Sequence, residues 1–248
     1  MSKQITPKLL AEFIGTFSFV FIGAGAAAVV GDGVGLPGIA AVAVAHGLTI
    51  MVFAFAYGSI SGGHMNPAVT VGVLAAGAMS VGEAIGYIVS QLVGGVAGAL
   101  LLSAVLGGAE TGLGTPALAH DLALGATSLT ITPVAGFMIE AVLAFFLVTV
   151  VLSTAVAGRA GNLAPLAIGM TLTLNIIMGG ALTGAAFNPA RALGPMVATG
   201  NFSDAWLYLT APIVGAIVAA IVHIGLARLA RERMVAVEQG SAAQTPAE

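Results

Sequence analysis

The chain contains no cysteine and very few charged residues. The absence of cysteine excludes disulfide bonds, thiol redox chemistry and thiolate metal sites. Four scattered histidines without cysteine indicate neither a nucleophile–base pair nor a metal cluster, so we predict no enzyme activity and no metal. No phosphate-binding loop, cofactor signature or nucleic-acid patch is present, and we therefore expect no cofactor and no nucleic-acid partner.

Charged residues make up only 7% of the 248 residues, whereas a soluble domain carries about a quarter. Hydrophobic residues make up 58%, and the mean hydropathy is +1.08. At about 20 apolar residues per span, this composition predicts an all-α integral membrane protein in a lipid bilayer. The six expected spans are 8–30, 39–59, 82–106, 134–157, 164–182 and 205–228.

Two further apolar pieces, 66–77 and 188–199, are too short to cross a membrane. Each has about 11 residues, or about 16 Å of helix, which crosses only half of a hydrocarbon core. Each begins with an Asn that suits a helix N-cap and a Pro that suits the first helical position. These Asn-Pro-Ala copies are Asn66, Pro67, Ala68 and Asn188, Pro189, Ala190. We predict two re-entrant half-helices, because non-helical backbone at membrane depth must be buried in protein or line a water-filled cavity.

Basic residues near the ends of the spans fall on one side of the membrane, which the positive-inside rule makes cytoplasmic. They are Lys3, Lys8, Arg159, Arg228, Arg231 and Arg233. The loops on the opposite side carry acidic residues, namely Asp32, Glu110, Asp121 and Asp204. Both termini are therefore expected in the cytoplasm, and we expect the protein in the plasma membrane.

The two halves of the sequence repeat the same order of features. Glu12 in the first span lies 54 residues before Asn66, and Glu140 in the fourth span lies 48 residues before Asn188. An odd number of spans per half inverts the second copy, and inverted repeats place their site near the midplane where broken helices meet. The expected units are a first repeat 1–106, an outer connecting loop 107–133, a second repeat 134–229 and a disordered cytoplasmic tail 230–248.

Several segments together carry a resemblance to a known family. They are the two Asn-Pro-Ala boxes, Ala-Glu-Phe-Ile-Gly-Thr-Phe in the first span, Ile-Ser-Gly-Gly-His-Met-Asn-Pro-Ala-Val-Thr, and Asn-Pro-Ala-Arg followed by Leu-Gly-Pro. Over roughly residues 8–228 the chain resembles the aquaporin (major intrinsic protein) family. The resemblance implies six transmembrane helices and two half-helices around a pore in each subunit, a homotetramer, and passive conduction of water.

The starts of the half-helices carry the chemistry of the expected pore. The amides of Asn66 and Asn188 should donate hydrogen bonds to a passing water, and two facing helix N-termini raise a barrier to cations and protons. The backbone before each Asn should offer a ladder of carbonyl oxygens, from Gly62, Gly63, His64, Gly184, Ala185 and Ala186. Arg191 lies in the first turn of a helix at membrane depth, where a cation is costly, and that cost indicates function.

In the family, an Arg at the position of Arg191 forms the outer selectivity filter. The resemblance places the other filter residues at His46, Ile176 and Ala185. This set is similar to that of some tonoplast-type plant aquaporins, which pass ammonia or urea besides water. We therefore predict a water channel that also passes small neutral solutes such as ammonia and excludes protons and ions.

A glycerol or urea facilitator is the alternative. Glycerol facilitators carry Asp where this chain has Ala192, whereas Leu209 resembles that class and Tyr208 resembles the water channels. Two histidines remain: His223 is expected to pack within the sixth span, and His120 is a candidate for the outer pore mouth.

An ion-coupled secondary transporter is the alternative from a different class, since it shares inverted repeats and broken helices. Its coupling site would have to use Glu12 and Glu140, the two acids inside the spans. We favour a structural role for both, in which each accepts hydrogen bonds from the N–H groups of a re-entrant loop.

Overall fold

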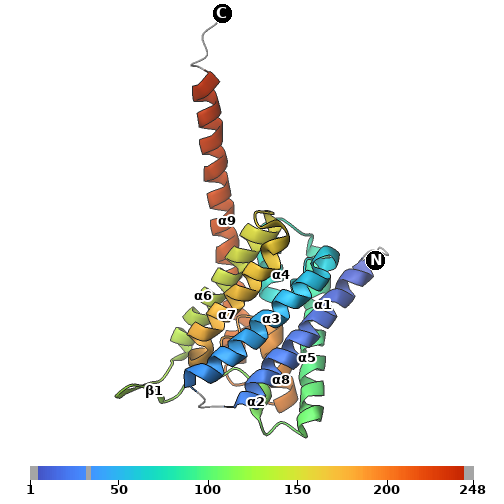
Figure 1. Cartoon of the computed structure of the whole chain (residues 1–248), viewed down its shortest axis with the longest axis vertical. Helices are drawn as coiled ribbons and strands as arrows, with labels where there is room; N and C mark the ends of the chain where they lie inside the picture. The colour runs from blue at the N-terminus through green and yellow to red at the C-terminus, as the bar shows by residue number, and fades with distance from the viewer. Residues whose placement is uncertain (1–4, 32–34, 243–248) are drawn as a thin grey trace, which may run out of the picture.

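Long apolar helices make up most of the protein, of which the computed structural model describes residues 5–31 and 35–242 (Figure 1). Six helical segments within these residues are long and apolar enough to cross a membrane. They are Ile5–Val30, Pro37–Ser61, Val81–Leu106, Pro133–Val156, Gly161–Thr183 and Ala205–Met234. The predicted all-α fold with six spans is confirmed.

The spans are assembled from helices that include two π-helical turns. The elements are α1 (Ile5–Phe19), π-turn η1 (Val20–Ala24), α2 (Gly25–Val30), α3 (Gly35–Ser61), α5 (Val81–Leu106), α6 (Pro133–Val151), π-turn η3 (Leu152–Val156), the 3₁₀ turn η4 (Gly161–Leu163), α7 (Ala164–Thr183) and α9 (Ala205–Ala242). The turn η1 interrupts the first span of its half, whereas η3 forms the last turn of the first span of the second half.

The two short helices are α4 (Pro67–Ala75) and α8 (Pro189–Thr199). Both begin at the predicted residue, because Asn66 and Asn188 adopt extended backbone and cap the helix with their side-chain oxygens. Helix α4 ends two residues earlier than the expected 77, at a turn in which Gly77 has a φ of +75°.

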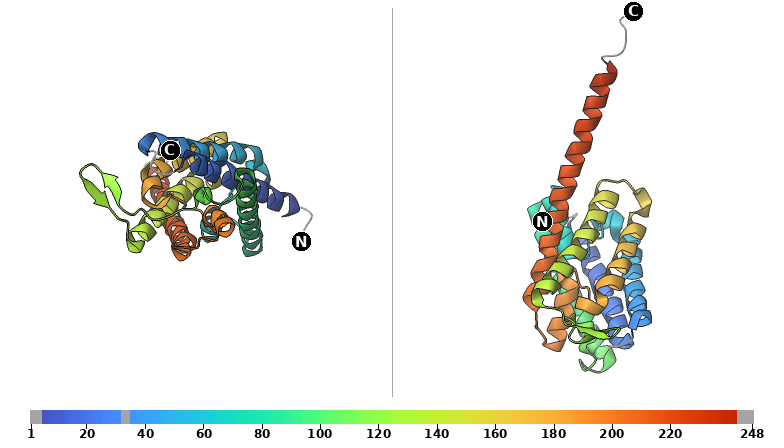
Figure 2. Two further views of the ribbon diagram at one scale, coloured as in Figure 1. Left: turned by 90° about the horizontal axis from the view of Figure 1, so that it is seen from below. Right: turned by 90° about the vertical axis from the view of Figure 1, so that its left-hand side faces the viewer.

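The long helices pair in the same way in both halves. Helix α1 packs against α5, as α6 packs against α9, and α3 packs against α7 across the two halves. Each short helix packs on the last long helix of the other half, α4 on α9 and α8 on α5. The halves therefore interlock through their half-helices. Figure 2 shows the helical bundle from the end and from the side.

Glycine lets these helices touch backbone to backbone. A Cβ atom at Gly98 of α5 would lie 2.5 Å from the carbonyl oxygen of Phe17 in α1. In the second half, a Cβ atom at Gly215 of α9 would lie 1.9 Å from the carbonyl oxygen of Ala141 in α6. Close contact at small residues is typical of helix pairs in membranes, where apolar surface alone gives no preference for protein over lipid.

Helix α9 continues far beyond the bundle, as Figure 1 shows, and ends at Ala242. The predicted disordered tail from residue 230 is therefore wrong for residues 230–242. The polar composition suggested disorder, but Ala, Arg, Glu and Met are strong helix formers, and Arg228 pairs with Glu232 one turn later at 2.8 Å. Residues 243–248 of the predicted tail lie outside the described residues, as do Lys3 and Asp32.

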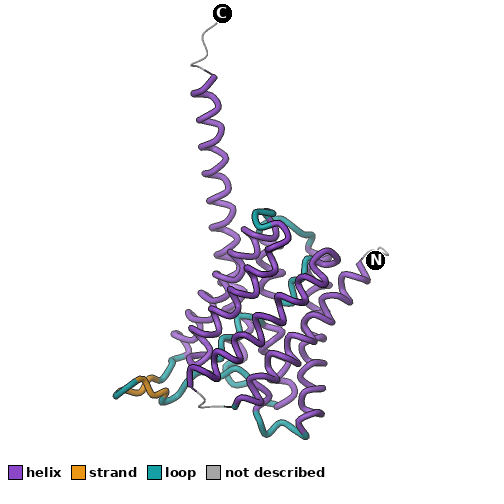
Figure 3. Tube along the Cα trace, viewed as in Figure 1, coloured by secondary structure: helices purple, strands orange, loops and turns teal. Residues whose placement is uncertain are grey.

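The connector between the halves contains two strands that the sequence analysis did not predict. Strands β1 (Leu122–Leu124) and β2 (Thr127–Leu129) pair antiparallel, with Leu122 opposite Leu129 (Figure 3). Before the hairpin, the 3₁₀ turn η2 (Gly112–Gly114) lies against α8 and α2. The connector is thereby held against the bundle at the end opposite to the α6–α7 turn.

Candidate functional site: a pore between two half-helices

Glu140 ties the second re-entrant loop to α6. One carboxylate oxygen accepts hydrogen bonds from the Thr183 hydroxyl at 2.6 Å and from the Ala186 N–H at 3.0 Å. The other oxygen accepts one from the Phe187 N–H at 2.5 Å. A fully buried carboxylate is costly unless its oxygens are satisfied, and these three donors satisfy them.

Glu12 holds the first loop in the same way from α1. Its oxygens accept from the Ser61 hydroxyl at 2.6 Å and from the backbone N–H groups of His64 at 2.9 Å and Met65 at 2.6 Å. A fourth donor, the amide of Gln91 on α5, lies 2.7 Å from the carboxylate and also donates to the Thr70 hydroxyl at 2.9 Å. Sequence reasoning missed Gln91, because one polar residue in an apolar helix carries no signal of its partner.

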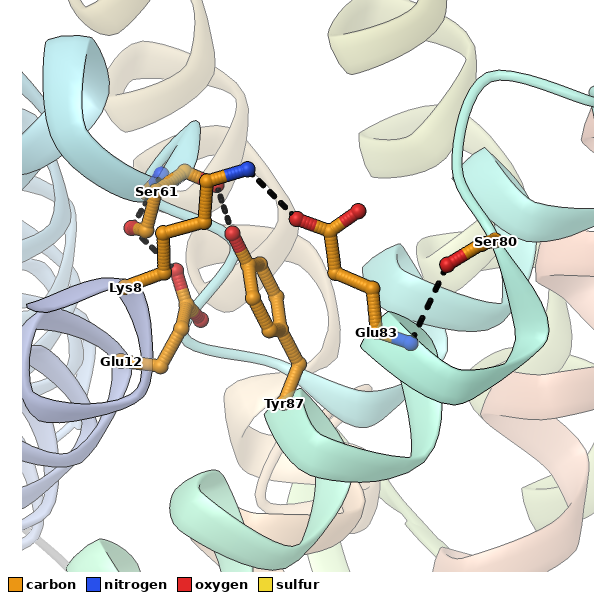
Figure 4. A network of polar contacts seen from close by, with 7 residues as sticks. Lys8, Glu12, Ser61, Ser80, Glu83 and Tyr87 are labelled. Carbon is orange, nitrogen blue, oxygen red and sulfur yellow. Dashed lines mark hydrogen bonds and ion pairs between the residues drawn. The ribbon is translucent and has the colours of Figure 1, made fainter. Parts of the chain in front are cut away.

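A tyrosine in each half fastens the residue at which the loop begins. The Tyr87 hydroxyl donates to the carbonyl oxygen of Ser61 at 2.7 Å, and the Tyr208 hydroxyl donates to that of Thr183 at 2.8 Å. Figure 4 shows Tyr87 reaching Ser61 beside Glu12. An ion pair between Lys8 and Glu83, at 2.6 Å, lies close to these residues. The loops are thus held from two helices each.

The two half-helices meet at their N-terminal ends. The Asn66 Nδ2 group donates to the carbonyl oxygen of Phe187 at 3.0 Å, and the Asn188 Nδ2 group donates to that of Met65 at 3.0 Å. The side-chain oxygen of each Asn faces its own helix and accepts from a backbone N–H there. An amide NH₂ has two hydrogens, so after the bond across the halves each Asn retains a second N–H.

The backbone N–H groups before each Asn are bound by side chains of the protein. The N–H of Gly63 binds the Ser61 hydroxyl at 3.1 Å, and that of Ala185 binds the Thr183 hydroxyl at 3.2 Å. The next two N–H groups of each loop bind the buried acid, as described above. Left-handed φ values of +88° at Gly62 and +76° at Gly184 start both loops, which glycine adopts without strain.

A cavity reaches the Asn pair from the side of the first loop. It contains three of the six predicted ladder residues, Gly62, Gly63 and His64, whereas Gly184, Ala185 and Ala186 lie in the loop on the opposite side. Its lining comprises Phe19, Ile50, Gly62, Gly63, His64, Asn66, Val69, Leu147, Val151, Ile168, Leu172, Phe187 and Asn188. A wider hollow that opens at Lys8 and Glu83 shares Gly62, His64, Val151 and Ile168 with this cavity. The wider hollow is therefore adjacent to the cavity that reaches the Asn pair.

Arg191 is almost completely buried in the first turn of α8. Its guanidinium donates to the carbonyl oxygen of Gly114 in η2 at 2.8 Å, which fixes the connector to the half-helix. The Arg191 Nε–H has no hydrogen-bond partner within residues 5–31 and 35–242. Arg191 thus retains a buried donor beyond the one that anchors it.

His46 is also buried, and it complements Arg191 chemically. Its Nδ1 lies 2.9 Å from the carbonyl oxygen of Val42, which can only accept, so Nδ1 carries the hydrogen and Nε2 is an acceptor. That Nε2 has no hydrogen-bond partner in the described part of the chain. The ring packs edge-on against Phe19 at a centroid distance of 5.3 Å.

The other two predicted filter residues are also buried, Ile176 within α7 and Ala185 two residues after its end. A Cβ atom at Gly180 would lie 3.4 Å from Ile176, and one at Gly179 would lie 3.3 Å from the Cβ of Ala185. Both residues are apolar, so they add no hydrogen-bonding group to those of His46 and Arg191. The predicted set therefore combines one buried acceptor and one buried donor with two apolar side chains.

Comparison with known proteins decides the family. The sequence matches the family described as "Major intrinsic protein" over residues 1–223, which is most of the chain. The chain belongs to the major intrinsic protein family. This aquaporin family comprises passive membrane channels, so the chain is a multi-pass channel protein and no enzyme, and the predicted resemblance is confirmed.

Among the curated members of the family, several plant aquaporins are similar to this chain. Aquaporin TIP2-1 of Arabidopsis thaliana is 38% identical over 222 residues, which cover 86% of this chain and 84% of the relative. Aquaporin TIP1-2 of Zea mays is 40% identical over 222 residues, which cover 86% and 83%. The aquaglyceroporin from Plasmodium falciparum shares the major intrinsic protein fold, with a TM-score of 0.71 and 23% identity over 87% of this chain and 94% of that one.

These comparisons place the chain in a membrane but do not support the plasma membrane in particular, since tonoplast-type members stand among the similar relatives. Of the two remaining histidines, His120 lies exposed in the connector just before β1, and His223 lies half-buried on α9. Neither lines the cavity that reaches the Asn pair. The side chains that line this cavity therefore come from other residues.

Proposed function

We propose that the protein is a passive channel for water and ammonia that excludes protons and ions. The observation that carries this proposal is the pair of Asn amides at the inner end of the cavity, where two helix N-termini meet. Each amide is oriented by a bond across the halves and keeps a second N–H for the permeant. A molecule with a lone pair, such as water or ammonia, accepts from these donors.

Exclusion of protons and cations follows from the same arrangement. The N-termini of α4 and α8 carry partial positive charge, and they point at one another across the Asn pair. A cation approaching this point meets both positive ends, which is a known device against cation passage. A water that accepts from both Asn amides also cannot accept a hydrogen bond from the next water, so a proton wire is interrupted.

The filter residues support ammonia as a second permeant. Water and ammonia can each accept from the Arg191 Nε–H and donate to the His46 Nε2, which are two of the three buried side-chain groups without a hydrogen-bond partner among the described residues. Ile176 supplies an apolar wall at which the permeant loses part of its hydration. This loss costs less free energy for ammonia than for water, because ammonia is less strongly hydrated. Ala192 is fully buried and apolar, and so offers glycerol no hydrogen bond.

The buried acids favour a channel over an ion-coupled transporter. Within the described part of the chain, Glu12 accepts four hydrogen bonds and Glu140 accepts three, all from their own half. A coupling site needs an acid that exchanges ions during transport, whereas these carboxylates hold the loops. We further propose that the subunits form a homotetramer and that both termini face the cytoplasm, where Arg159 and Arg228 lie near the span ends.

Flux measurements on purified protein in liposomes test the proposal. We expect water and ammonia to pass the wild type rapidly, independently of proton and sodium gradients, with little glycerol flux. The variant Ile176→His adds a hydrogen-bonding ring to the filter and should lower ammonia flux several-fold while it preserves water flux. Ile176→Val is the matched control and should conduct both. Dominant glycerol flux, or a dependence on ion gradients, would contradict the proposed function.

Mercurial reagents should leave water conduction unchanged, because the sequence contains no cysteine to react with them. The expected stopped-flow rate is the same before and after treatment. A control variant, Ala185→Cys, introduces a thiol at a predicted filter position and should become sensitive to the reagent. Inhibition of the wild type that is reversed by a thiol reductant would contradict this prediction.

A further inference from the structure

The π-helical turn η1 touches two separate parts of the filter, and no sequence motif singled it out. It comprises residues Val20–Ala24, between α1 and α2. π-turns inside α-helices are uncommon, and they occur frequently at functional sites. Two consecutive residues of this turn, Gly23 and Ala24, make the contacts that matter here.

Gly23 supports the ring of His46. A Cβ atom at Gly23 would lie 2.6 Å from Cδ2 and 2.7 Å from Nε2 of His46. Real Cβ atoms do not approach other atoms so closely, so the imidazole lies directly on the glycine backbone. With the Nδ1–H bound to Val42 and the ring edge on Phe19, the ring has contacts on three sides.

Ala24 supports the anchor of Arg191. A Cβ atom at Gly114 would lie 2.6 Å from the carbonyl oxygen of Ala24 and 3.1 Å from its Cα. The Gly114 backbone thus lies against the turn, and its own carbonyl accepts the hydrogen bond from Arg191. The neighbouring Leu113 has a left-handed φ of +48° and is fully buried in a cluster with Val20 and Ala24.

We propose that the π-turn η1 is a specificity-determining element, which sets the separation between the His46 acceptor and the Arg191 donor. The turn contacts His46 through Gly23, and it supports Arg191 through Ala24 and Gly114. The strained conformation of Leu113 is maintained because its side chain is buried against the same turn. This inference rests on the proposed function, since it assigns η1 to the filter of that pore.

The variant Gly23→Ala tests the inference in the full-length protein in liposomes. The added methyl must displace the His46 ring from η1, and because Phe19 and Val42 hold the ring on other sides, we expect it to move towards Arg191. Water flux should fall about tenfold, the change produced by about 1.4 kcal/mol of added barrier. The matched control is Gly25→Ala at the first residue of α2, where the added Cβ would lie 3.2 Å from Leu102 and would contact no filter residue.

A double-mutant cycle separates displacement of His46 from general damage to the helix. In an His46→Ala background the new methyl has no ring to displace, so Gly23→Ala should change the flux less than twofold relative to His46→Ala alone. Equal flux of Gly23→Ala and Gly25→Ala would overturn the inference, as would a full Gly23→Ala effect without the ring. If the wild type itself conducts no water above empty liposomes, the proposed function fails, and that result is distinguishable from both.

Discussion

Replacement of Glu140 by alanine is expected to abolish water conduction and to prevent accumulation of folded protein. The Thr183 hydroxyl and two backbone N–H groups of the second loop would lose the carboxylate that accepts their hydrogen bonds, in the buried interior of the protein. An unsatisfied buried donor costs about 1–3 kcal/mol, so the sum is comparable with the stability of a whole domain. The measurements are the yield of monodisperse protein in detergent and stopped-flow water flux.

The matched control for Glu140→Ala is Met138→Ala, on the same helix but on its exposed side. It should fold and conduct like the wild type. Glu140→Gln retains one carbonyl oxygen but places an NH₂ against loop donors, so we expect an intermediate yield. Normal conduction by Glu140→Ala would show that the loop does not depend on the acid.

Replacement of Arg191 by alanine is expected to make the channel leak cations. At an effective dielectric constant near 20, a monovalent cation about 8 Å from the guanidinium is repelled by about 2 kcal/mol, or about 30-fold in rate. The change also frees Gly114 and removes bulk from the filter, so urea and glycerol flux should rise. Proton and potassium flux into dye-loaded liposomes measure the effect.

Arg191→Lys separates charge from geometry. It keeps the positive charge but lacks the planar fork that holds Gly114, so the cation barrier should remain while neutral-solute selectivity weakens. A cation leak of equal size in Arg191→Ala and Arg191→Lys would show that the position of the connector excludes cations, and that the positive charge at residue 191 does not.

The start of each half-helix could be predicted from the sequence because its signals are local. Asn66 and Asn188 cap the helices that follow them, and Pro adjacent to each suits the first turn. The two buried acids could also be interpreted correctly as supports of the loops, because a re-entrant loop has N–H groups that need acceptors at membrane depth. These inferences depend only on neighbouring residues in the sequence and on the apolar environment of the membrane.

Other features could not be predicted because they depend on contacts between distant segments. Gln91 and Tyr87 resemble other polar residues in apolar helices until their partners, Glu12 and Ser61, are placed beside them. The π-turn η1 changes backbone geometry without a distinctive composition. The part of helix α9 beyond residue 230 has a local signal that the prediction did not follow. Its residues have high helix propensity, but their polar composition suggested disorder.

The pattern of hydrogen bonds around the two acids bears on biosynthesis. Among the described residues, all donors to Glu12 come from residues 61–91, which are made before the second half exists, and all donors to Glu140 come from the second half. The hydrogen bonds between each buried acid and its loop can therefore form while that half of the chain leaves the ribosome and enters the bilayer. The bonds of Asn66 and Asn188 then join two preassembled parts, so the last step of assembly is a docking reaction.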